Sequence, residues 1–181
     1  MLKTLMSIAS LVGVLSLAAN ANAQALPTAT GAGFLQAGGG YTFANPDYGQ
    51  FKIQGGTAYV DYDFRPHWGV EAEAHIIALI TPTDLAENSF LIGPRYVYPH
   101  GRFSLYAKGM LGIGNIDIQE AQDNPQGGAG NYFAYAAGAG VDYRLTRHII
   151  LRPIDFEYQH WSYLTGLTPT VFTVGAAYRF R

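Results

Sequence analysis

Acidic and basic residues recur at every second position along several stretches of the chain, a spacing that could serve ion pairing or an ion path. Asp61 and Asp63 are two residues apart, as are Glu71 and Glu73. Side chains two apart in a β-strand lie on the same face, so such groups converge on one surface. Charges withdrawn from water pair with one another, which favours a structural network of ion pairs over a gated ion path. The predicted members of this network are Asp61, Asp63, Glu71, Glu73, Arg95, Lys108, Asp142, Arg144, Asp155, Glu157 and Arg179.

The register around Pro153 decides where Arg152 points. Proline cannot donate a backbone hydrogen bond to a neighbouring strand, so Pro153 indicates a bulge or an edge irregularity. Strict alternation places Arg152 on the apolar face, opposite Asp155 and Glu157. We therefore expect Arg152 to point away from the charged network.

His160 and Ser162 are the residues with the clearest potential for nucleophilic catalysis. They are two apart and share a face, so the serine could act as nucleophile and the histidine as base. No Asp or Glu follows Ser162 to orient the histidine. We favour the alternative that His160 and Trp161 end a strand as part of an interfacial girdle.

Three further histidines fall in short turns, each beside an arginine. They lie in separate turns without the spacing of metal ligands, so they predict a basic rim rather than a metal site. The pairs are His67 with Arg65, His100 with Arg102, and His148 with Arg147. The sequence predicts neither a metal nor a cofactor.

The elements that must position these groups are strands, because apolar and polar residues alternate with a period of two. Long connections that are rich in Pro, Gly, Asp and Asn alternate with short ones. The predicted strands are 33–43, 54–64, 68–80, 89–98, 103–116, 132–145, 149–161 and 170–180. The predicted short turns are 65–67, 99–102 and 146–148, and the long connections are 44–53, 81–88, 117–131 and 162–169. The acidic residues of the long connections are Asp47, Asp84, Glu87, Asp117, Glu120 and Asp123, and Lys52 is their only lysine or arginine.

Composition narrows the class of protein. The chain has 13 tyrosines, 10 phenylalanines, 22 glycines and no cysteine, with only 13% charged residues and a net charge of -2. The absence of basic excess argues against nucleic acid as a partner. The strongly apolar run Ile76–Ile80 is far shorter than the roughly 20 residues that a membrane helix needs. The chain past its leader is thus either soluble or a closed barrel.

The two faces of the predicted strands favour a membrane barrel with its apolar face outward. The polar faces carry both signs of charge and many small residues, which suits a narrow, filled interior without an open pore. The apolar faces end in aromatic residues, as interfacial girdles do. These aromatics are Tyr41, Phe43, Tyr62, Phe64, Phe103, Tyr143, Tyr178 and Phe180.

Both ends of the chain carry export signals. Lys3, the apolar run 5–19 and Ala21-Asn22-Ala23 form a cleavable signal peptide of residues 1–23. Near the C-terminus, Thr173, Gly175, Tyr178 and Phe180 fill the pattern polar-x-Gly-x-x-aromatic-x-aromatic, with Arg181 one residue beyond. This strand resembles the targeting signal of bacterial outer-membrane barrels, which implies recognition by the barrel-assembly machinery.

Beyond the signal peptide the chain resembles the small eight-stranded outer-membrane β-barrels of the OmpA/OmpX-like superfamily. The resemblance implies an all-β, antiparallel, up-and-down transmembrane barrel in the bacterial outer membrane. It also implies contact with outer-membrane lipids and lipopolysaccharide. Roles in that superfamily range from structural support to adhesion, defence and, rarely, lipid chemistry, without shared catalytic residues.

The lipid chemistry of one such barrel, lipid A 3-O-deacylase, uses a His-x-Ser pair on its lipid-facing surface. His160 and Ser162 are similar to that pair, but Tyr163 stands where that family has asparagine.

We therefore expect a signal peptide (1–23), an N-terminal periplasmic segment (24–32) and a barrel domain (33–181) without a following domain. The predicted function is non-enzymatic: structural support or surface interaction in the envelope. The alternatives are a lipid-modifying barrel enzyme that uses His160 and Ser162, and a soluble periplasmic barrel that binds a small apolar ligand.

Overall fold

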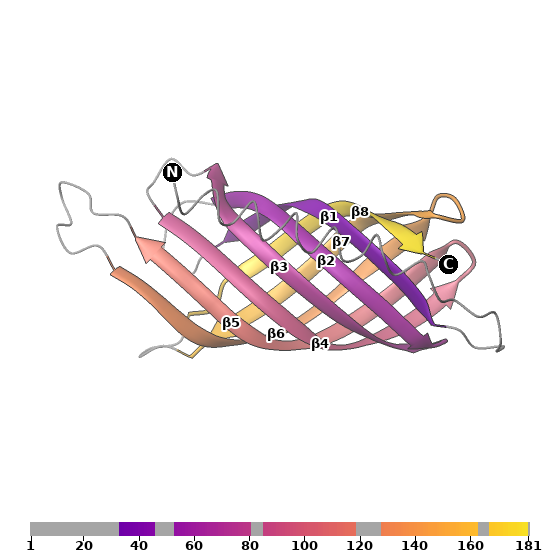
Figure 1. Ribbon diagram of the computed structural model, residues 1–181, viewed down its shortest axis with the longest axis horizontal. Helices are drawn as coiled ribbons and strands as arrows, with labels where there is room; N and C mark the ends of the chain where they lie inside the picture. The colour runs from indigo at the N-terminus through magenta and orange to yellow at the C-terminus, as the bar shows by residue number, and fades with distance from the viewer. Residues whose placement is uncertain (1–32, 46–52, 81–84, 119–127, 163–166, 181) are drawn as a thin grey trace, which may run out of the picture. The chain divides into compact units, whose positions relative to one another are not determined.

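The computed structural model describes residues 33–45, 53–80, 85–118, 128–162 and 167–180. The described residues form eight strands that close into one antiparallel barrel with neighbours paired in chain order (Figure 1). The strands are β1 (Phe34–Asn45), β2 (Ile53–Arg65), β3 (Trp68–Ile80), β4 (Leu85–His100), β5 (Phe103–Ile118), β6 (Gly128–Arg144), β7 (Ile149–Trp161) and β8 (Thr170–Phe180). The predicted fold class is confirmed.

The strand bounds follow the sequence pattern closely. The bounds of β3, β7 and β8 are the predicted ones, and β5 differs only at its far end. Pairing with β5 extends the start of β4 to Leu85, so the predicted connection 81–88 is too long. As a result Glu87, which we predicted to lie in that connection, belongs to a strand and is buried. The predicted signal peptide and the segment 24–32 lie outside the described residues.

The barrel closes because β1 pairs with both β2 and β8. Tyr41 stands opposite Gly56 in β2 and opposite Val174 in β8. Short turns join β2 to β3, β4 to β5 and β6 to β7 at one end, which we call the short-turn end. In the turn between β4 and β5, Gly101 has a φ of 64°, a conformation that glycine adopts without steric cost. The opposite end, with the longer connections, is the long-loop end.

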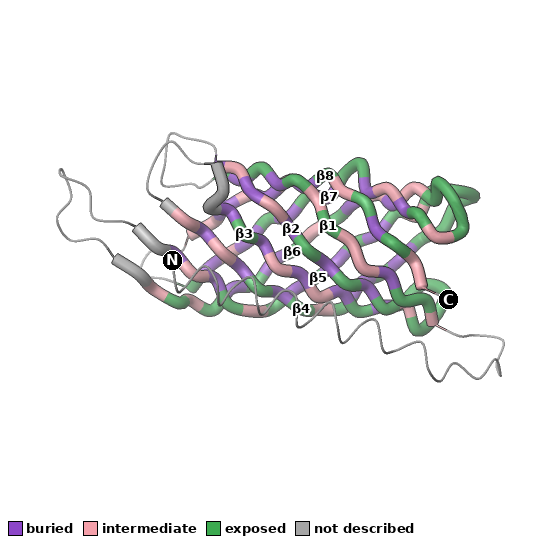
Figure 2. Tube along the Cα trace, turned by 45° about the horizontal axis from the view of Figure 1, so that its top comes forward, coloured by how far each residue is buried: buried purple, intermediate pink, exposed green. Residues whose placement is uncertain are grey.

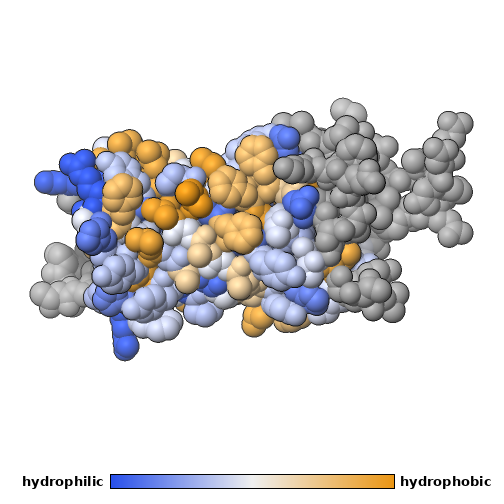
Figure 3. Space-filling view, turned by 180° about the vertical axis from the view of Figure 1, so that it is seen from behind, coloured by the Kyte–Doolittle hydropathy of each residue, from blue (hydrophilic) through white to orange (hydrophobic). Residues whose placement is uncertain are grey.

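Burial alternates along every strand and decides which face points out (Figure 2). On the outside, Phe90 is 58% exposed and Ile92 is 57% exposed. Inside the barrel, Asp61 and Glu71 are 0% exposed. Apolar side chains cover the wall between the ends of the barrel (Figure 3). This is the reverse of a soluble barrel, so the soluble alternative is wrong.

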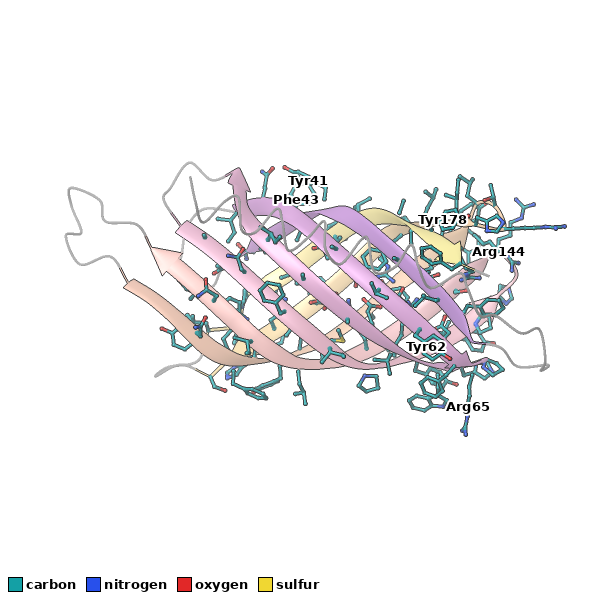
Figure 4. All side chains as sticks on the ribbon, viewed as in Figure 1. Tyr41, Phe43, Tyr62, Arg65, Arg144 and Tyr178 are labelled. Carbon is teal, nitrogen blue, oxygen red and sulfur yellow. The ribbon has the colours of Figure 1, made fainter. Side chains whose placement is uncertain are left out.

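Aromatic side chains mark both edges of this apolar wall. Tyr41 and Phe43 lie near the long-loop end, whereas Tyr62 and Tyr178 lie near the short-turn end (Figure 4). Such paired girdles sit at the two membrane–water interfaces of a transmembrane barrel. Among the described residues, no helix is long and apolar enough to cross a membrane.

The position of Arg152 differs from the one that strict alternation predicts. The ladder between β7 and β8 shifts register between Arg152 and Asp155, so Pro153 and Ile154 both lie outside. A bulge adds a residue to one strand and inverts the alternation beyond it. The side chains of Arg152 and Asp155 therefore both point inward, and Arg152 is 0% exposed. The prediction that Arg152 points away from the network is wrong.

Candidate functional site

Lys108 on β5 lies at the centre of one half of the charged lumen. Its Nζ atom is 2.8 Å from Glu71 Oε1 and 2.8 Å from Glu73 Oε2. It is also 3.0 Å from Asp155 Oδ2 and 2.6 Å from Glu157 Oε1. All five side chains are buried, and they come from β3, β5 and β7. The single ammonium thus bridges four carboxyl groups and offsets part of the repulsion among them.

Arg152 on β7 organises the other half. Its Nε is 2.9 Å from Asp142 Oδ1, its Nη1 is 3.0 Å from Glu71 Oε1, and its Nη2 is 2.8 Å from Asp61 Oδ2. Its guanidinium carbon lies 3.8 Å from the centre of the Tyr59 ring. Several carboxylates and an aromatic face therefore hold the planar guanidinium, an arrangement that an arginine satisfies and a lysine does not.

Arg95 on β4 completes this half of the network. Its guanidinium pairs with Asp61 and Asp142, and it is 3.4 Å from Glu71 Oε2. It stacks over Tyr106, with 4.1 Å between its guanidinium carbon and the ring centre. Asp61 and Asp142 therefore each bridge Arg95 and Arg152, which ties β2, β4, β6 and β7 together across the lumen.

His75 links the charged layer to a layer of hydroxyl groups. Its Nδ1 is 2.6 Å from Thr57 Oγ1, and its Nε2 is 3.2 Å from Glu157 Oε2. Thr57 in turn contacts Thr42, which lies 3.0 Å from Thr173. This ring of buried threonines connects β1, β2 and β8 beside the closing seam of the barrel.

A continuous path of polar contacts runs along the lumen. At its ends, Trp161 Nε1 donates to Gln159 at 3.0 Å, and Arg179 Nη2 donates to Gln36 at 3.1 Å. In order from the long-loop end, its members are Trp161, Gln159, Glu157, Lys108, Glu71, Arg152, Asp61, Gln36 and Arg179.

Apolar side chains fill the lumen on the long-loop side of this network. Trp161, which we predicted to belong to an outer girdle, is 2% exposed and points inward. Its ring takes the space beside Gly114, where a Cβ would lie 2.5 Å from the indole. The cluster consists of Leu91, Met110, Ile116, Ala134, Ala136 and Trp161. The lumen is thus closed by packing as well as by charge.

The predicted charged residues do not all join the buried network. Asp61, Glu71, Glu73, Arg95, Lys108, Asp142, Asp155 and Glu157 are brought together in it. Asp63 and Arg179 are half-buried near the short-turn end. Arg144 is exposed, and its Nη2 donates to the carbonyl of Gly101 at 3.1 Å instead of to a carboxylate. Arg144 therefore lies outside the lumen network, because it is the last residue of β6.

Two groups of acidic and histidine side chains have the spacing of metal ligands. Within Glu73, His75 and Glu157, and within Glu71, Glu73 and Asp155, ligand atoms lie within 4.8 Å of one another. Lys108 contacts a carboxylate of both groups and supplies the positive charge that a metal would otherwise bring. The geometry is that of an ion-pair cluster.

His160 and Ser162 show no catalytic arrangement in the described part of the chain. The ring of His160 packs on Tyr135 with 4.8 Å between ring centres, and Ser162 is exposed. The backbone N–H of Ser162 donates to the carbonyl of Phe133 at 2.8 Å. No hydrogen bond joins His160 to Ser162 among the described residues.

The turn histidines hold the short-turn end in place. His67 Nδ1 lies 2.9 Å from the carbonyl of Val97, and the ring stacks on Tyr96. His148 Nδ1 lies 3.2 Å from the carbonyl of Arg179, and the ring stacks on Tyr178. Their contacts are structural.

The predicted C-terminal signal residues divide between the two faces of β8. Thr173 is 2% exposed within the lumen, and Tyr178 is 50% exposed on the outside. Gly175 lies against β1, where a Cβ would be 2.5 Å from the carbonyl oxygen of Gly39. Tyr178 and Phe180 meet edge to face, with ring centres 5.1 Å apart. The strand for which a signal is predicted is thus also the strand that closes the barrel.

Solved structures similar to this barrel are small outer-membrane barrels. Ail, the attachment invasion locus protein of Yersinia pestis, is 22% identical, with 82% of this chain and 99% of Ail covered and a TM-score of 0.57. Neisserial surface protein A is 14% identical over 82% of this chain and 96% of its own, with a TM-score of 0.58. The N-terminal barrel domain of Pseudomonas aeruginosa OprF is 13% identical, with 82% of this chain and 98% of the OprF domain covered and a TM-score of 0.59.

At sequence identities this low, the similarity to these solved structures shows a shared fold and no more. Comparison with curated proteins gives no match. The family described as outer membrane protein beta-barrel domain, however, matches residues 8–180, which include every strand of the barrel. The chain therefore belongs to the outer membrane protein beta-barrel domain family and is a protein of the bacterial outer membrane.

Proposed function

We propose that the protein is a non-enzymatic barrel that supports the outer membrane and presents its long-loop end for surface contacts. The observation that carries this proposal is the filled lumen. Eight strands enclose a space that side chains can fill completely. Here Trp161 and its apolar neighbours fill the long-loop half, and Lys108, Arg152 and Arg95 with their carboxylates fill the middle.

The lumen network serves, on this proposal, to hold the wall together. Asp61, Asp142 and Glu71 each contact more than one cation, and the contacts join strands that are not neighbours in the barrel. Removing one partner of such a network leaves a buried charge uncompensated, which is strongly unfavourable. The network therefore favours one closed arrangement of the wall over alternatives with a wider interior.

The surface role is supported by the charge of the long connections. Ail has been crystallised with the heparin analogue sucrose octasulfate, a polyanion. The long connections of this chain are acidic, with Asp47, Asp84, Glu120 and Asp123 against Lys52. A polyanion without bridging cations is therefore a poor partner for this end. Outer-membrane lipids and lipopolysaccharide, reached through divalent cations that bridge phosphate and carboxylate, suit it better.

We propose a second partner, which acts during assembly of the barrel. Phe180 and Tyr178 end the strand that pairs with β1, and both aromatics lie on the outer face of the closing seam. An aromatic end on the last strand fits the proposal that the barrel-assembly machinery recognises β8 before closure.

Reconstitution in planar bilayers tests the closed lumen. We expect no steady single-channel conductance from the wild type, because side chains of the described strands fill the lumen. A steady conductance typical of a diffusion pore would refute the closed barrel as the basis of function.

A dye-uptake assay tests the envelope role. A strain that lacks the protein should take up an apolar fluorescent dye faster than the wild type, and the wild-type gene should restore the barrier. A variant with Asp47, Asp84, Glu120 and Asp123 changed to the amides should restore it less, at equal barrel level in the membrane. Equal uptake by all strains would refute the envelope role.

A further inference from the structure

The short-turn mouth of the barrel contains two adjoining cavities that the lumen network does not fill. The larger has a volume of about 510 Å³ and the smaller about 320 Å³. Both are lined by Phe34, Arg102, Arg144 and Arg179. The larger cavity reaches outward to the turn between β6 and β7, where Arg147 lines it, and the smaller reaches inward to Asp63 and Asp142.

Positive charge dominates the larger cavity. The charged residues that line it are four arginines, without an acidic residue: Arg102, Arg144, Arg147 and Arg179. Among the described residues, none of these arginines has a carboxylate within 4.0 Å, whereas Arg95, Lys108 and Arg152 each have at least three. The wall of the larger cavity thus carries guanidinium groups that form no direct ion pair with a carboxylate of the described chain.

Several donors of this cavity remain available to a ligand. Arg179 gives one Nη2 bond to Gln36, but its buried Nε has no hydrogen-bond partner among the described residues. Arg144 uses one Nη2 bond on the carbonyl of Gly101. Thr146 accepts bonds from the backbone N–H groups of His148 and Ile149, so its own hydroxyl hydrogen can still be donated.

The acidic residues nearby do not cancel this charge. Asp142 already pairs with Arg95 and Arg152 on the lumen side. Asp63 lines only the smaller cavity. An anion in the larger cavity would therefore meet guanidinium groups without a facing carboxylate.

The mouth also lies at the depth of lipid headgroups. Arg144 and Arg65 lie at the same end of the barrel as the girdle residues Tyr62 and Tyr178 (Figure 4). Aromatic girdles mark the membrane–water interface, and short turns of such barrels face the periplasm. Phe34, which is 51% exposed and lies under the guanidinium of Arg179 at 5.2 Å, gives the cavity an apolar edge.

We propose that the larger cavity binds a phosphate group, supplied either by the headgroup of an inner-leaflet phospholipid or by a soluble phosphate compound. Guanidinium groups match the geometry of phosphate oxygens and bind them bidentately. Basic pockets at membrane interfaces capture anionic headgroups by the same contacts.

The test uses the chain without its signal peptide, refolded in an uncharged maltoside detergent and a phosphate-free buffer of low ionic strength. Calorimetric titration measures binding of inorganic phosphate, of short-chain phosphatidylglycerol and of a tetraglutamate peptide. The variants are Arg144→Gln and Arg147→Gln, and the matched control is Arg65→Gln, which removes the same charge from the same end but lines only the smaller cavity. Faster migration on an unboiled gel reports that each variant is folded. Arg147 makes no hydrogen bond through its side chain among the described residues, so its variant tests the site even if Arg144→Gln does not fold.

We expect each of the two variants to weaken phosphate binding by about tenfold, and Arg65→Gln by less than about twofold. Binding of inorganic phosphate assigns the site to soluble phosphate compounds, and binding of phosphatidylglycerol alone assigns it to lipid headgroups. The proposal is overturned if neither probe binds or if Arg65→Gln weakens binding as much as Arg144→Gln. It is also overturned if tetraglutamate binds as tightly as phosphate, which would indicate an acidic peptide as ligand.

Discussion

Replacing Arg152 with methionine tests whether the lumen network holds the barrel together. Methionine keeps much of the length and apolar volume of the side chain, so the change removes the charge and the hydrogen bonds more than the packing. Asp61, Glu71 and Asp142 each lose a partner at 3.0 Å or less. Arg95 and Lys108 still contact these carboxylates, so the network is weakened rather than abolished.

The expected loss of stability follows from the burial of Arg152. Arg152 is 0% exposed, so water cannot replace the lost contacts. Removing one partner from a buried ion-pair network destabilises proteins by about 3–5 kcal/mol. Acidification should reduce this loss of stability, because protons taken up by the native state replace part of the positive charge that the carboxylates lose with Arg152.

The assay is equilibrium unfolding in urea of protein reconstituted in lipid vesicles, followed by the fluorescence of the two tryptophans, Trp68 and Trp161. The matched control is Arg65→Met, at an exposed residue that ends β2, for which we expect a change within about 0.5 kcal/mol. The double variant with Asp61→Asn should recover part of the stability lost by Arg152→Met. A loss of stability below about 1 kcal/mol for Arg152→Met, or one equal to that of Arg65→Met, would refute the reasoning.

Three further changes test separate parts of the barrel. Gly93→Ala should destabilise the barrel by about 1–3 kcal/mol in the same unfolding assay, because its Cβ would lie 1.9 Å from the carbonyl oxygen of Gly109. Gly109→Ala has open space, so a similar loss there would contradict this explanation. Phe180→Ala should lower the amount of barrel in the outer membrane several-fold, as shown by immunoblotting, while refolding in detergent proceeds. Phe172→Ala, on the same strand, should not, and equal loss in both would count against a terminal signal. Ser162→Ala should leave the mass spectrum of lipid A unchanged, and an altered acylation pattern would revive the enzymatic alternative.

The sequence determined the strands and most of their faces. Alternation with a period of two is a local property, so the bounds of β3, β7 and β8 could be predicted without knowledge of their partners. The same alternation put Asp61, Glu71 and Lys108 on one surface, and membrane burial then required them to pair. The charged layer of the lumen was thus largely predictable.

Tertiary structure decided what the alternation could not. Arg152 joins the network because a bulge at Pro153 shifts the register against β8, and the partner strand determines that shift. Trp161 shares the lumen face of Asp155 and Glu157 by alternation, but only the folded barrel shows that Gly114 on a distant strand leaves room for its ring there. The arginines of the larger cavity come together only when the turn between β4 and β5, the turn between β6 and β7 and the end of β8 meet around a closed wall. In a regular strand the local sequence sets the face of a side chain. At a bulge the pairing with the partner strand sets that face, and closure of the barrel sets what each side chain meets.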